Sequence, residues 1–269
     1  MTTISSPDDF AATDPVEVAM TRRRILHAAG ALGAGVLLSA LAVDRAVAAT
    51  TKKTTKNAAA AKTACVPIPT ETGGPFPGDG TNGVNVLTEK GIVRRDIRPS
   101  FGSMTGVAPG VPLMINLTVR RTSSSCAAFP NAAVYIWHCD AIGQYSLYSI
   151  ETENYLRGVQ VADGKGVVSF LTSFPGAYPG RWPHVHFEVY ADLASATSGR
   201  NAIKTSQLAL PEATCKAVYA GPGYDGSAAN LGSTPLARDG QFRDGWATQM
   251  PTVAGDVKKG FSTNLVVNV

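Results

Sequence analysis

Short segments in which apolar residues occupy every second position recur from residue 65 onward. In residues 112–121, Leu113, Ile115, Leu117 and Val119 are separated by single residues. Side chains of a strand point alternately to its two faces, so this spacing predicts a strand with one buried face. Four further segments follow the pattern and are bounded by turn-forming residues: 132–140, 166–172, 184–191 and 262–269. The repeated period of two predicts an all-β fold.

Helical patterns are scarce in the same part of the chain. Only residues 194–199 and 211–220 have the composition for a helical turn or two, and neither carries a long amphipathic stripe. The 27 Gly, 17 Pro and 16% charged residues argue against a coiled coil or a helical bundle, while 44% hydrophobic residues argue against a disordered chain. We therefore expect a single antiparallel β-sandwich with long loops and little helix.

The N-terminal segment has the pattern of an export signal. Arg22 and Arg23 precede an apolar run over residues 28–43, and the small residues at 46–48 supply a cleavage pattern. Paired arginines before a weakly hydrophobic run predict a twin-arginine signal peptide in residues 1–48. An ordinary secretory signal is the alternative, and the sequence leaves the exact cleavage site open.

The remainder of the chain divides into a linker and one domain. Residues 49–64 are rich in Thr, Lys and Ala without periodicity and are predicted to be a disordered linker, and residues 65–269 are predicted to be the folded domain. That domain has 16 basic and 15 acidic residues, which removes the electrostatic case for binding nucleic acid. We expect a secreted or extracytoplasmic protein with no stable membrane anchor after signal cleavage.

The cysteines bear on the redox compartment. All four lie in the predicted domain, at Cys65, Cys126, Cys139 and Cys215. None belongs to a Cys-x-x-Cys pair, so two disulfides are favoured over a zinc site in an oxidising compartment. The three possible connectivities stay open, and free buried thiols are the alternative.

Two histidines separated by one residue form half of a candidate metal site. His184 and His186 lie in a predicted strand, so both imidazoles point to one face. Val185 and Phe187 then point to the opposite face, toward the core. A His-x-His triplet is weak evidence by itself, because such spacing also arises incidentally in strands.

Two tyrosines strengthen the case for a metal. Tyr178 and Arg181 lie in the Pro- and Gly-rich loop just before the histidines, and Tyr145 lies in a Gly-containing turn after an earlier predicted strand. Phenolate oxygens beside imidazole nitrogens suit ferric iron better than zinc. The alternative for Arg181 is an ion pair with Glu188 or Asp192.

Several segments together match a known family in order and spacing. They are 72–76 (Thr-Gly-Gly-Pro-Phe), 94–98 (Arg-Arg-Asp-Ile-Arg), 134–145, 175–187 and 205–208 (Thr-Ser-Gln-Leu). In these segments the sequence resembles the intradiol ring-cleaving dioxygenases, which include protocatechuate 3,4-dioxygenase and catechol 1,2-dioxygenase. Its tetrapeptides at 137–140 (Trp-His-Cys-Asp) and 178–181 (Tyr-Pro-Gly-Arg) are most similar to the exported bacterial branch of that family.

The resemblance implies a non-haem Fe(III) enzyme that needs no other cofactor. Such an enzyme cleaves catechol-type diols with O2, incorporates both oxygen atoms and gives cis,cis-muconic acids. The metal ligands that it implies are Tyr145, Tyr178, His184 and His186. It also implies that Tyr178 leaves the iron when substrate binds and that Arg181 is the cation over the substrate ring. The residues that it places along the substrate pocket are Pro75, Phe76 and Gln207.

Two other functions fit parts of the pattern. A cupin also uses His-x-His, but it needs a glutamate four or five residues after the second histidine and a later histidine, and neither is present. A non-catalytic exported β-sandwich binding module stays an alternative, because a fold does not determine a function. The preferred catechol and the oligomeric state are not determined by the sequence.

Three further polar residues are assigned structural roles. His138 is out of phase with Trp137 in its predicted strand, so we expect it to support the fold. Arg95 and Asp96 are expected to form an ion pair that also supports the fold.

Overall fold

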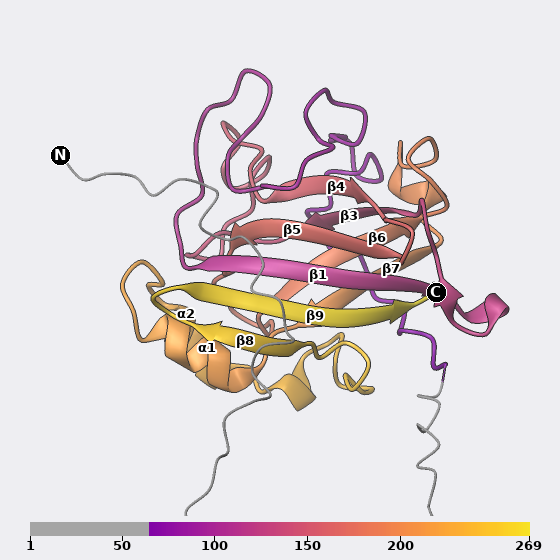
Figure 1. Cartoon of the computed structure of the whole chain (residues 1–269). Helices are drawn as coiled ribbons and strands as arrows, with labels where there is room; N and C mark the ends of the chain where they lie inside the picture. The colour runs from indigo at the N-terminus through magenta and orange to yellow at the C-terminus, as the bar shows by residue number, and fades with distance from the viewer. Residues whose placement is uncertain (1–64) are drawn as a thin grey trace, which may run out of the picture. The chain divides into compact units, whose positions relative to one another are not determined.

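The computed structural model describes residues 65–269, and the predicted signal peptide (1–48) and linker (49–64) lie outside the described residues. The strands of the described part form two sheets (Figure 1). The strands are β1 (Pro112–Arg121), β2 (Ala127–Ala128), β3 (Ala133–Trp137), β4 (Arg157–Val161), β5 (Val167–Ser173), β6 (His184–Tyr190), β7 (Lys204–Ala209), β8 (Thr252–Asp256) and β9 (Gly260–Asn268). The helices are α1 (Glu212–Tyr219) and α2 (Ser227–Ser233), with 3-10 turns η2 (Thr122–Ser124), η3 (Gly199–Asn201) and η4 (Leu236–Arg238).

The predicted β-sandwich is confirmed, with one correction to its topology. One sheet has the order β2-β1-β9-β8 with β5 paired to β1, and the other has the order β4-β3-β6-β7. All strand pairs are antiparallel except β1 and β9, which run parallel. A parallel pair requires a long connection, and here the chain crosses the second sheet and both helices before it returns as β9.

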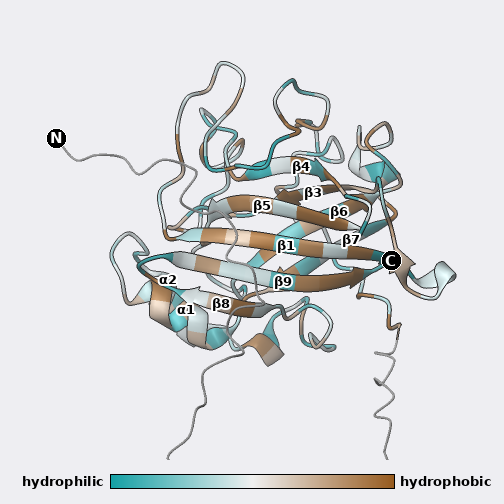
Figure 2. Ribbon diagram, in the orientation of Figure 1, coloured by the Kyte–Doolittle hydropathy of each residue, from teal (hydrophilic) through white to brown (hydrophobic). Residues whose placement is uncertain are grey.

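The main hydrophobic core lies between the two sheets. The inward residues of β1, such as Leu113 and Ile115, are completely buried against Val185 and Phe187 of β6. Figure 2 shows hydrophobic stretches along β1, β5 and β9 of one sheet and along β3 and β6 of the other. The period of two in the sequence therefore reports the core face of these strands correctly.

A second hydrophobic cluster covers the opposite face of the four-stranded sheet. Tyr135 and Trp137 of β3 are fully buried there beneath the loops that carry Val86, Ile92 and Tyr145. These loops form an additional layer over β3, β4 and β6, so this face of the sheet is shielded from solvent.

The helices agree only in part with the sequence pattern. Helix α1 falls within the predicted 211–220 segment, whereas residues 194–199 form turns that lead into η3. In that segment the Ser195 hydroxyl donates to the carbonyl of Asp192, and such local side-chain bonds compete with a helix. Helix α2 was not predicted, because only Ser227 and Leu231 of its residues are buried and no periodic stripe results.

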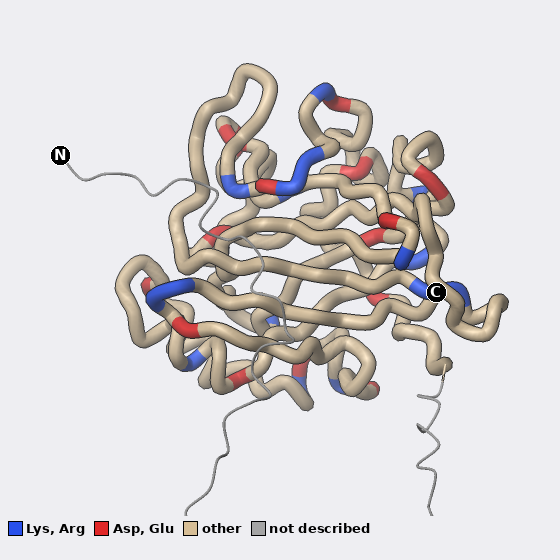
Figure 3. The backbone as a smooth tube through the Cα atoms, viewed as in Figure 1, with Lys and Arg blue, Asp and Glu red and all other residues tan. Residues whose placement is uncertain are grey.

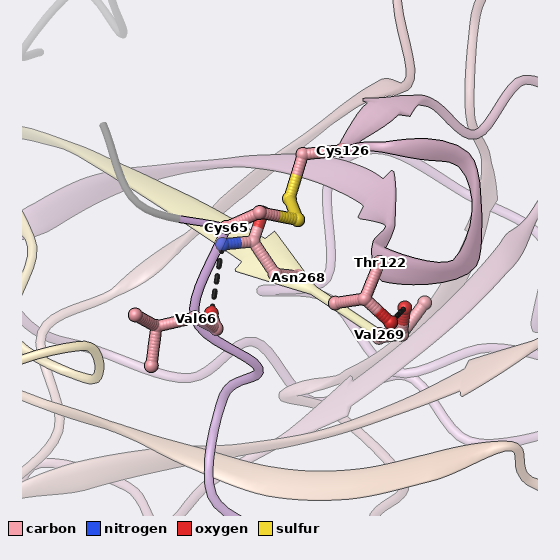
Figure 4. The surroundings of a disulfide bond; sticks show 6 residues. All are labelled: Cys65, Val66, Thr122, Cys126, Asn268 and Val269. Carbon is pink, nitrogen blue, oxygen red and sulfur yellow. Dashed lines mark hydrogen bonds between the residues drawn. A yellow bond between two sulfur atoms is a disulfide. The ribbon is translucent and has the colours of Figure 1, made fainter. Parts of the chain in front are cut away.

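One disulfide forms, so the expectation of two is wrong. Cys65 and Cys126 are joined with their Cα atoms 5.7 Å apart, beside a hydrogen bond of 2.8 Å from the Asn268 side chain to the Val66 carbonyl (Figure 4). Cys139 and Cys215 are free thiols. Each is buried and directs its sulfur at a different carbonyl, and burial raises the pKa of both thiols.

Charged residues of both signs are interspersed along the loops and strand ends rather than gathered in a single stretch of the backbone (Figure 3). The expected pair of Arg95 with Asp96 does not form; Asp96 instead pairs with Arg98 at 2.7 Å. Residues two apart in an extended segment point to the same side, whereas neighbours point to opposite sides. In residues 65–269, no helix has the length and apolar character that crossing a membrane requires.

Candidate active site

Four donor atoms, the two tyrosine hydroxyl oxygens and the two histidine Nε2 atoms of the residues proposed as ligands, lie next to one another. The Tyr145 hydroxyl oxygen lies 3.3 Å from that of Tyr178, which lies 3.3 Å from His184 Nε2. His184 Nε2 in turn lies 3.0 Å from His186 Nε2. The structure thus brings together side chains from a turn, a loop and a strand that are up to 41 residues apart in the sequence.

Strand β6 fixes the two imidazoles. His184 and His186 are 2% and 3% exposed and face the second hydrophobic cluster, while Val185 and Phe187 between and beyond them belong to the main core. The Trp137 ring of β3 stacks on His186 at 4.8 Å with an interplanar angle of 4°. Core packing on one face and ring stacking on the other leave the imidazoles little freedom to rotate.

A tight turn places Tyr145 against the loop of Tyr178. The Asp140 carboxylate accepts the backbone N–H groups of Ile142 and Gln144 at 3.0 and 2.8 Å, as in an Asx turn. Gly143 has φ of +84°, and a Cβ there would lie 3.1 Å from Tyr178 Cβ. Glycine at this position therefore allows both the left-handed backbone and the close approach of the two tyrosine segments.

The two phenols differ in their access to solvent. Tyr145 is 2% exposed, whereas Tyr178 is only partly buried. Burial raises the pKa of Tyr178 to about 12, and burial together with the neighbouring Tyr178 raises the pKa of Tyr145 well above its ordinary value. In the protein alone both groups are therefore neutral phenols, and their ionisation requires a nearby cation.

The histidines are held in the neutral form that binds metals. Burial, followed by the charge of Arg181, lowers the pKa of His184 to about 3, and burial lowers the pKa of His186 well below its ordinary value. The Trp182 carbonyl lies 2.5 Å from His184 Nδ1 and can only accept a hydrogen bond, so the proton of this imidazole is on Nδ1. The lone pair of His184 Nε2 then lies on the side of the Tyr178 hydroxyl and His186 Nε2.

This arrangement fits a metal ion. Ligand atoms at about 2.0–2.1 Å from a metal lie about 2.9–3.4 Å from one another, and the three successive distances between the donor atoms fall in this range. Among residues 65–269 no three His, Cys, Asp or Glu side chains could share a metal ion, so a site here depends on the tyrosines. Two phenolate oxygens with two imidazole nitrogens are a donor set suited to ferric iron.

Arg181 is held beside the four rings by hydrogen bonds to Asp239 and Gln207. Its Nε donates to Asp239 at 2.9 Å and its Nη2 to the Gln207 side-chain oxygen at 2.5 Å. The alternative pairing with Glu188 or Asp192 is therefore wrong. Arg181 also affects the pKa values of the two histidines, which places its charge within electrostatic reach of the ring atoms.

Asp239 is a residue that sequence reasoning missed. It is completely buried, and the same Oδ2 that accepts from Arg181 also accepts the backbone N–H of Trp182 at 2.7 Å. One carboxylate thereby fixes both the side chain of Arg181 and the chain that leads to His184. Asp239 follows Arg181 by 58 residues and precedes a glycine, so its local sequence indicates only a turn.

The expected pocket residues lie around the cluster in different ways. The Phe76 ring packs on Tyr145 with centroids 5.1 Å apart, and Pro75 is exposed next to it. Gln207 is completely buried beside His186 in the register of β6 and β7, and its amide donates to the Thr72 carbonyl at 2.8 Å. Phe76 therefore borders Tyr145, and Gln207 borders the site through Arg181.

His138 has the structural role expected of it. Its ring is buried, with one nitrogen 2.7 Å from the Cys139 carbonyl and the other 2.7 Å from the Thr172 hydroxyl. Both ring nitrogens are therefore used within the fold, and His138 takes no part in the convergent group.

Arg157 is the second residue that the sequence did not single out. It is completely buried at the start of β4, and its guanidinium bonds to Ser146, immediately after Tyr145. Arginine is rarely buried without a charged partner, so a sequence pattern gives no reason to expect it there.

A separate apolar cavity of about 640 Å³ lies near α1 and α2. Its walls include Trp182, Tyr219, Leu231, Leu236, Trp246 and Met250. None of the four convergent rings lines it, and its only charged lining residues, Glu212 and Lys216, pair with each other at 2.6 Å. It lacks the convergent polar groups of a catalytic pocket.

Comparison with known proteins gives matches of structure only. The sequence matches no protein-family model and no curated protein. An intradiol ring-cleavage dioxygenase from Tetranychus urticae superposes with a TM-score of 0.58 at 23% identity, covering 76% of this chain and 94% of that one. A second dioxygenase structure superposes with a TM-score of 0.59, also at 23% identity and over the same shares of the two chains. The described part of the chain therefore has the fold of the intradiol ring-cleavage dioxygenases.

Proposed function

We propose that this protein is an Fe(III)-dependent intradiol dioxygenase that cleaves catechol-type diols with O2 to cis,cis-muconic acid products. The observation that carries the proposal is the convergence of four donor atoms. Successive distances of 3.3, 3.3 and 3.0 Å link the Tyr145 and Tyr178 hydroxyl oxygens to His184 Nε2 and then His186 Nε2. Fe(III) bound by these four groups would supply a Lewis acid that lowers the pKa of the hydroxyl groups of a catechol, and the deprotonated diol is electron-rich enough to react with O2.

Tyr178 is the ligand that we propose to leave when substrate binds. It is the more exposed of the two tyrosines, and its hydroxyl already lies within hydrogen-bond distance of Tyr145 and His184. A phenolate with a pKa raised to about 12 takes up a proton readily once it is no longer bound to a cation. Tyr178 would therefore accept a proton from the arriving diol.

Tyr145 is the phenol that we propose to stay in place. It is almost fully buried, and its ring centroid lies 5.1 Å from that of Phe76 and 5.8 Å from that of Tyr178. A side chain packed in this way cannot swing out without opening the loop layer. Tyr145 and the two histidines would then keep three ligand positions fixed while Tyr178 exchanges.

Arg181 would stabilise the negative charge that develops on the substrate ring. Its guanidinium is always cationic, and Asp239 and Gln207 fix it at 2.9 and 2.5 Å. A charge that is already oriented does not have to reorganise during the reaction, which is the basis of electrostatic catalysis.

A non-catalytic binding module is the less favoured alternative. A binding surface has no need for two phenols and two imidazoles that are largely desolvated and aimed at one point. The two functions differ in colour, because tyrosinate bound to Fe(III) absorbs visible light and a protein without such bonds does not.

The deciding experiment is a visible spectrum of the purified protein after loading with Fe(III). We expect a broad charge-transfer band that changes when catechol is added without oxygen, followed by O2 uptake and muconate absorbance when air is admitted. A loaded protein that is colourless and consumes no O2 with catechol would contradict the proposal.

We also propose that residues 1–48 direct export by the twin-arginine route. The Cys65–Cys126 disulfide supports export, because such bonds persist in oxidising compartments and are rare in the cytosol. Changing Arg22 and Arg23 to lysine should leave the uncleaved precursor inside cells of a bacterial host. Equal secretion of the variant and the wild type would show that another route is used.

A further inference from the structure

Arg157 is a buried cation without an acidic partner. Its side chain is completely inaccessible, and none of the ion pairs formed by residues 65–269 includes it. Burying an unpaired charge is costly unless every donor is hydrogen-bonded. A buried, unpaired arginine is therefore expected to have a specific role in the fold or in the site that offsets this free-energy cost.

All five N–H donors of Arg157 are used, each by a neutral oxygen. Nε donates to the Ser146 hydroxyl at 3.0 Å, and Nη2 donates to the carbonyls of Ser146 and Phe76, both at 2.9 Å. Nη1 donates to the Pro77 carbonyl at 2.8 Å and the Tyr135 hydroxyl at 3.1 Å. A guanidinium with its donors fully used is held in a single orientation.

These bonds join two segments of the candidate active site. Ser146 follows Tyr145 directly, and Phe76 is the residue whose ring packs on Tyr145 at 5.1 Å. Arg157 therefore fixes the segment that carries Tyr145 relative to the segment that carries Phe76. Gly78 leaves room for the guanidinium, because a Cβ at this position would lie 2.9 Å from Arg157 Nη1.

The loop between the two bonded positions is strained at both ends. Leu147 has φ of 68° and Leu156 has φ of 58°, in the left-handed region that bulky side chains avoid. Such conformations persist only where the surroundings over-determine them, and they are often found at functional sites. The bonds between Arg157 and Ser146 close this loop next to its two strained residues.

Arg157 also lies in line with the histidine site across the four-stranded sheet. Trp137 pairs with Arg157 on β4 and with His186 on β6, and His186 pairs with Gln207 on β7. Side chains in register on neighbouring strands share a face, so these residues form one row beneath the site. At one end of this row Arg157 bonds to Ser146, next to Tyr145, and at the other end Gln207 bonds to Arg181.

We propose that Arg157 is a positioning residue that fixes Tyr145 relative to the histidines before any metal binds. It acts through Ser146 and touches none of the four ring atoms. The inference rests on the proposed function, because the position of Tyr145 matters only if Tyr145 is a ligand.

The test measures how fast the iron-loaded protein loses Fe(III) to a chelator, followed by decay of the visible band. Ser146→Ala removes one acceptor of Arg157, and we expect about fivefold faster release, the factor that one lost hydrogen bond of about 1 kcal/mol gives. Ser173→Ala is the matched control. Both serines are buried and donate to a carbonyl, to Tyr155 and Ala108 respectively, but only Ser146 accepts from Arg157.

A double-mutant cycle gives the second readout. If Arg157 acts through Ser146, then adding Ser146→Ala to Arg157→Lys should accelerate release by clearly less than its effect in the wild type. Fully additive effects, or equal release rates in Ser146→Ala and Ser173→Ala, would overturn the inference. If Arg157→Lys does not fold, the two serine variants decide the question. A colourless wild type would instead overturn the proposed function itself, so the two failures can be told apart.

Discussion

Each of the four convergent residues contributes one atom that no neighbouring side chain can replace. Tyr145→Phe removes an oxygen and His186→Ala removes a nitrogen from the group spaced at 3.0–3.3 Å. We expect either variant to lose the visible band and ring cleavage together, measured by absorption and by O2 uptake with catechol. Tyr224→Phe, which also removes a buried hydroxyl, should keep both. A Tyr145 or His186 variant with wild-type colour and turnover would refute that ligand assignment.

Arg181 should affect turnover without affecting iron content. Arg181→Ala removes a charge that the buried Asp239 fixes at 2.9 Å, and we expect kcat to fall at least about tenfold, as for loss of a preorganised charge. The measurement is steady-state kinetics with iron quantified in the same samples. Arg98→Ala breaks the partly exposed pair with Asp96 and should change neither value. An unchanged kcat in Arg181→Ala would make this residue purely structural.

His138 should contribute to loss of stability in acid. Burial lowers its pKa in the folded protein to about 4, from an ordinary value of 6.5. Between these pH values the unfolded chain binds a proton that the folded protein does not, so stability falls as pH falls from about 6.5 to about 4. The iron-free His138→Gln variant should lose stability less steeply over this range in urea denaturation. A slope equal to that of the wild type would show that His138 is not the responsible group.

Site residues could be found from the sequence where a short local pattern marks them, and were missed where their role depends on residues distant in the sequence. His184 and His186 were identified because strand periodicity places both on one face, and the contact of 3.0 Å between their Nε2 atoms confirms that placement. Asp239 was missed because its partner Arg181 lies 58 residues away, and a turn aspartate next to glycine has no distinguishing pattern. Arg157 was missed because sequence patterns treat an arginine as solvent-exposed, whereas here five neutral oxygens surround it.

At the scale of elements, strands were predictable where apolar residues recur at every second position, whether the other face is partly exposed, as in β1, or covered by loops, as in β3 and β6. Strand β1 was predicted to the residue, because it alternates buried and partly exposed positions over its whole length. Strand β4 was missed because it begins with Arg157 and Gly158, which leaves only Val159 and Val161 as an alternating apolar pair. Strand β8 was missed because it lies at a sheet edge with four of its five residues exposed, which leaves no alternation.

The turn that carries Tyr145 should be sensitive to a single added methyl group. Gly143→Ala introduces a side chain at φ of +84° and 3.1 Å from Tyr178 Cβ, and we expect a loss of about 1–2 kcal/mol in the free energy of unfolding. We also expect faster release of iron, because the two tyrosine segments must separate. Gly102→Ala is the matched control, with φ of +69° and no atom near its Cβ. Equal losses in both variants would mean that only backbone strain matters.

At the scale of the whole molecule, the single disulfide joins the first described residue to the connection between β1 and β2. Cys65 and Cys126 are 61 residues apart, and a cross-link of this span typically stabilises a fold by about 2–4 kcal/mol through the unfolded state. We expect Cys126→Ser, or a reducing agent, to lower the free energy of unfolding by that amount in denaturant titrations. A reducing agent should have no effect on the Cys65→Ser/Cys126→Ser double variant, since Cys139 and Cys215 are already free thiols. A further loss in that variant would reveal another bond.

The parallel pairing of β9 with β1 has a consequence for biosynthesis. Strand β9 lies between β1 and β8, so the five-stranded sheet has a gap in its middle until residues 260–268 have left the ribosome. A nascent chain that stops earlier presents the unsatisfied backbone groups of β1 along a full edge, which is a template for aggregation. The sheet should therefore close only after β9 has emerged, and cells would need to shield the growing polypeptide with chaperones until that strand is inserted.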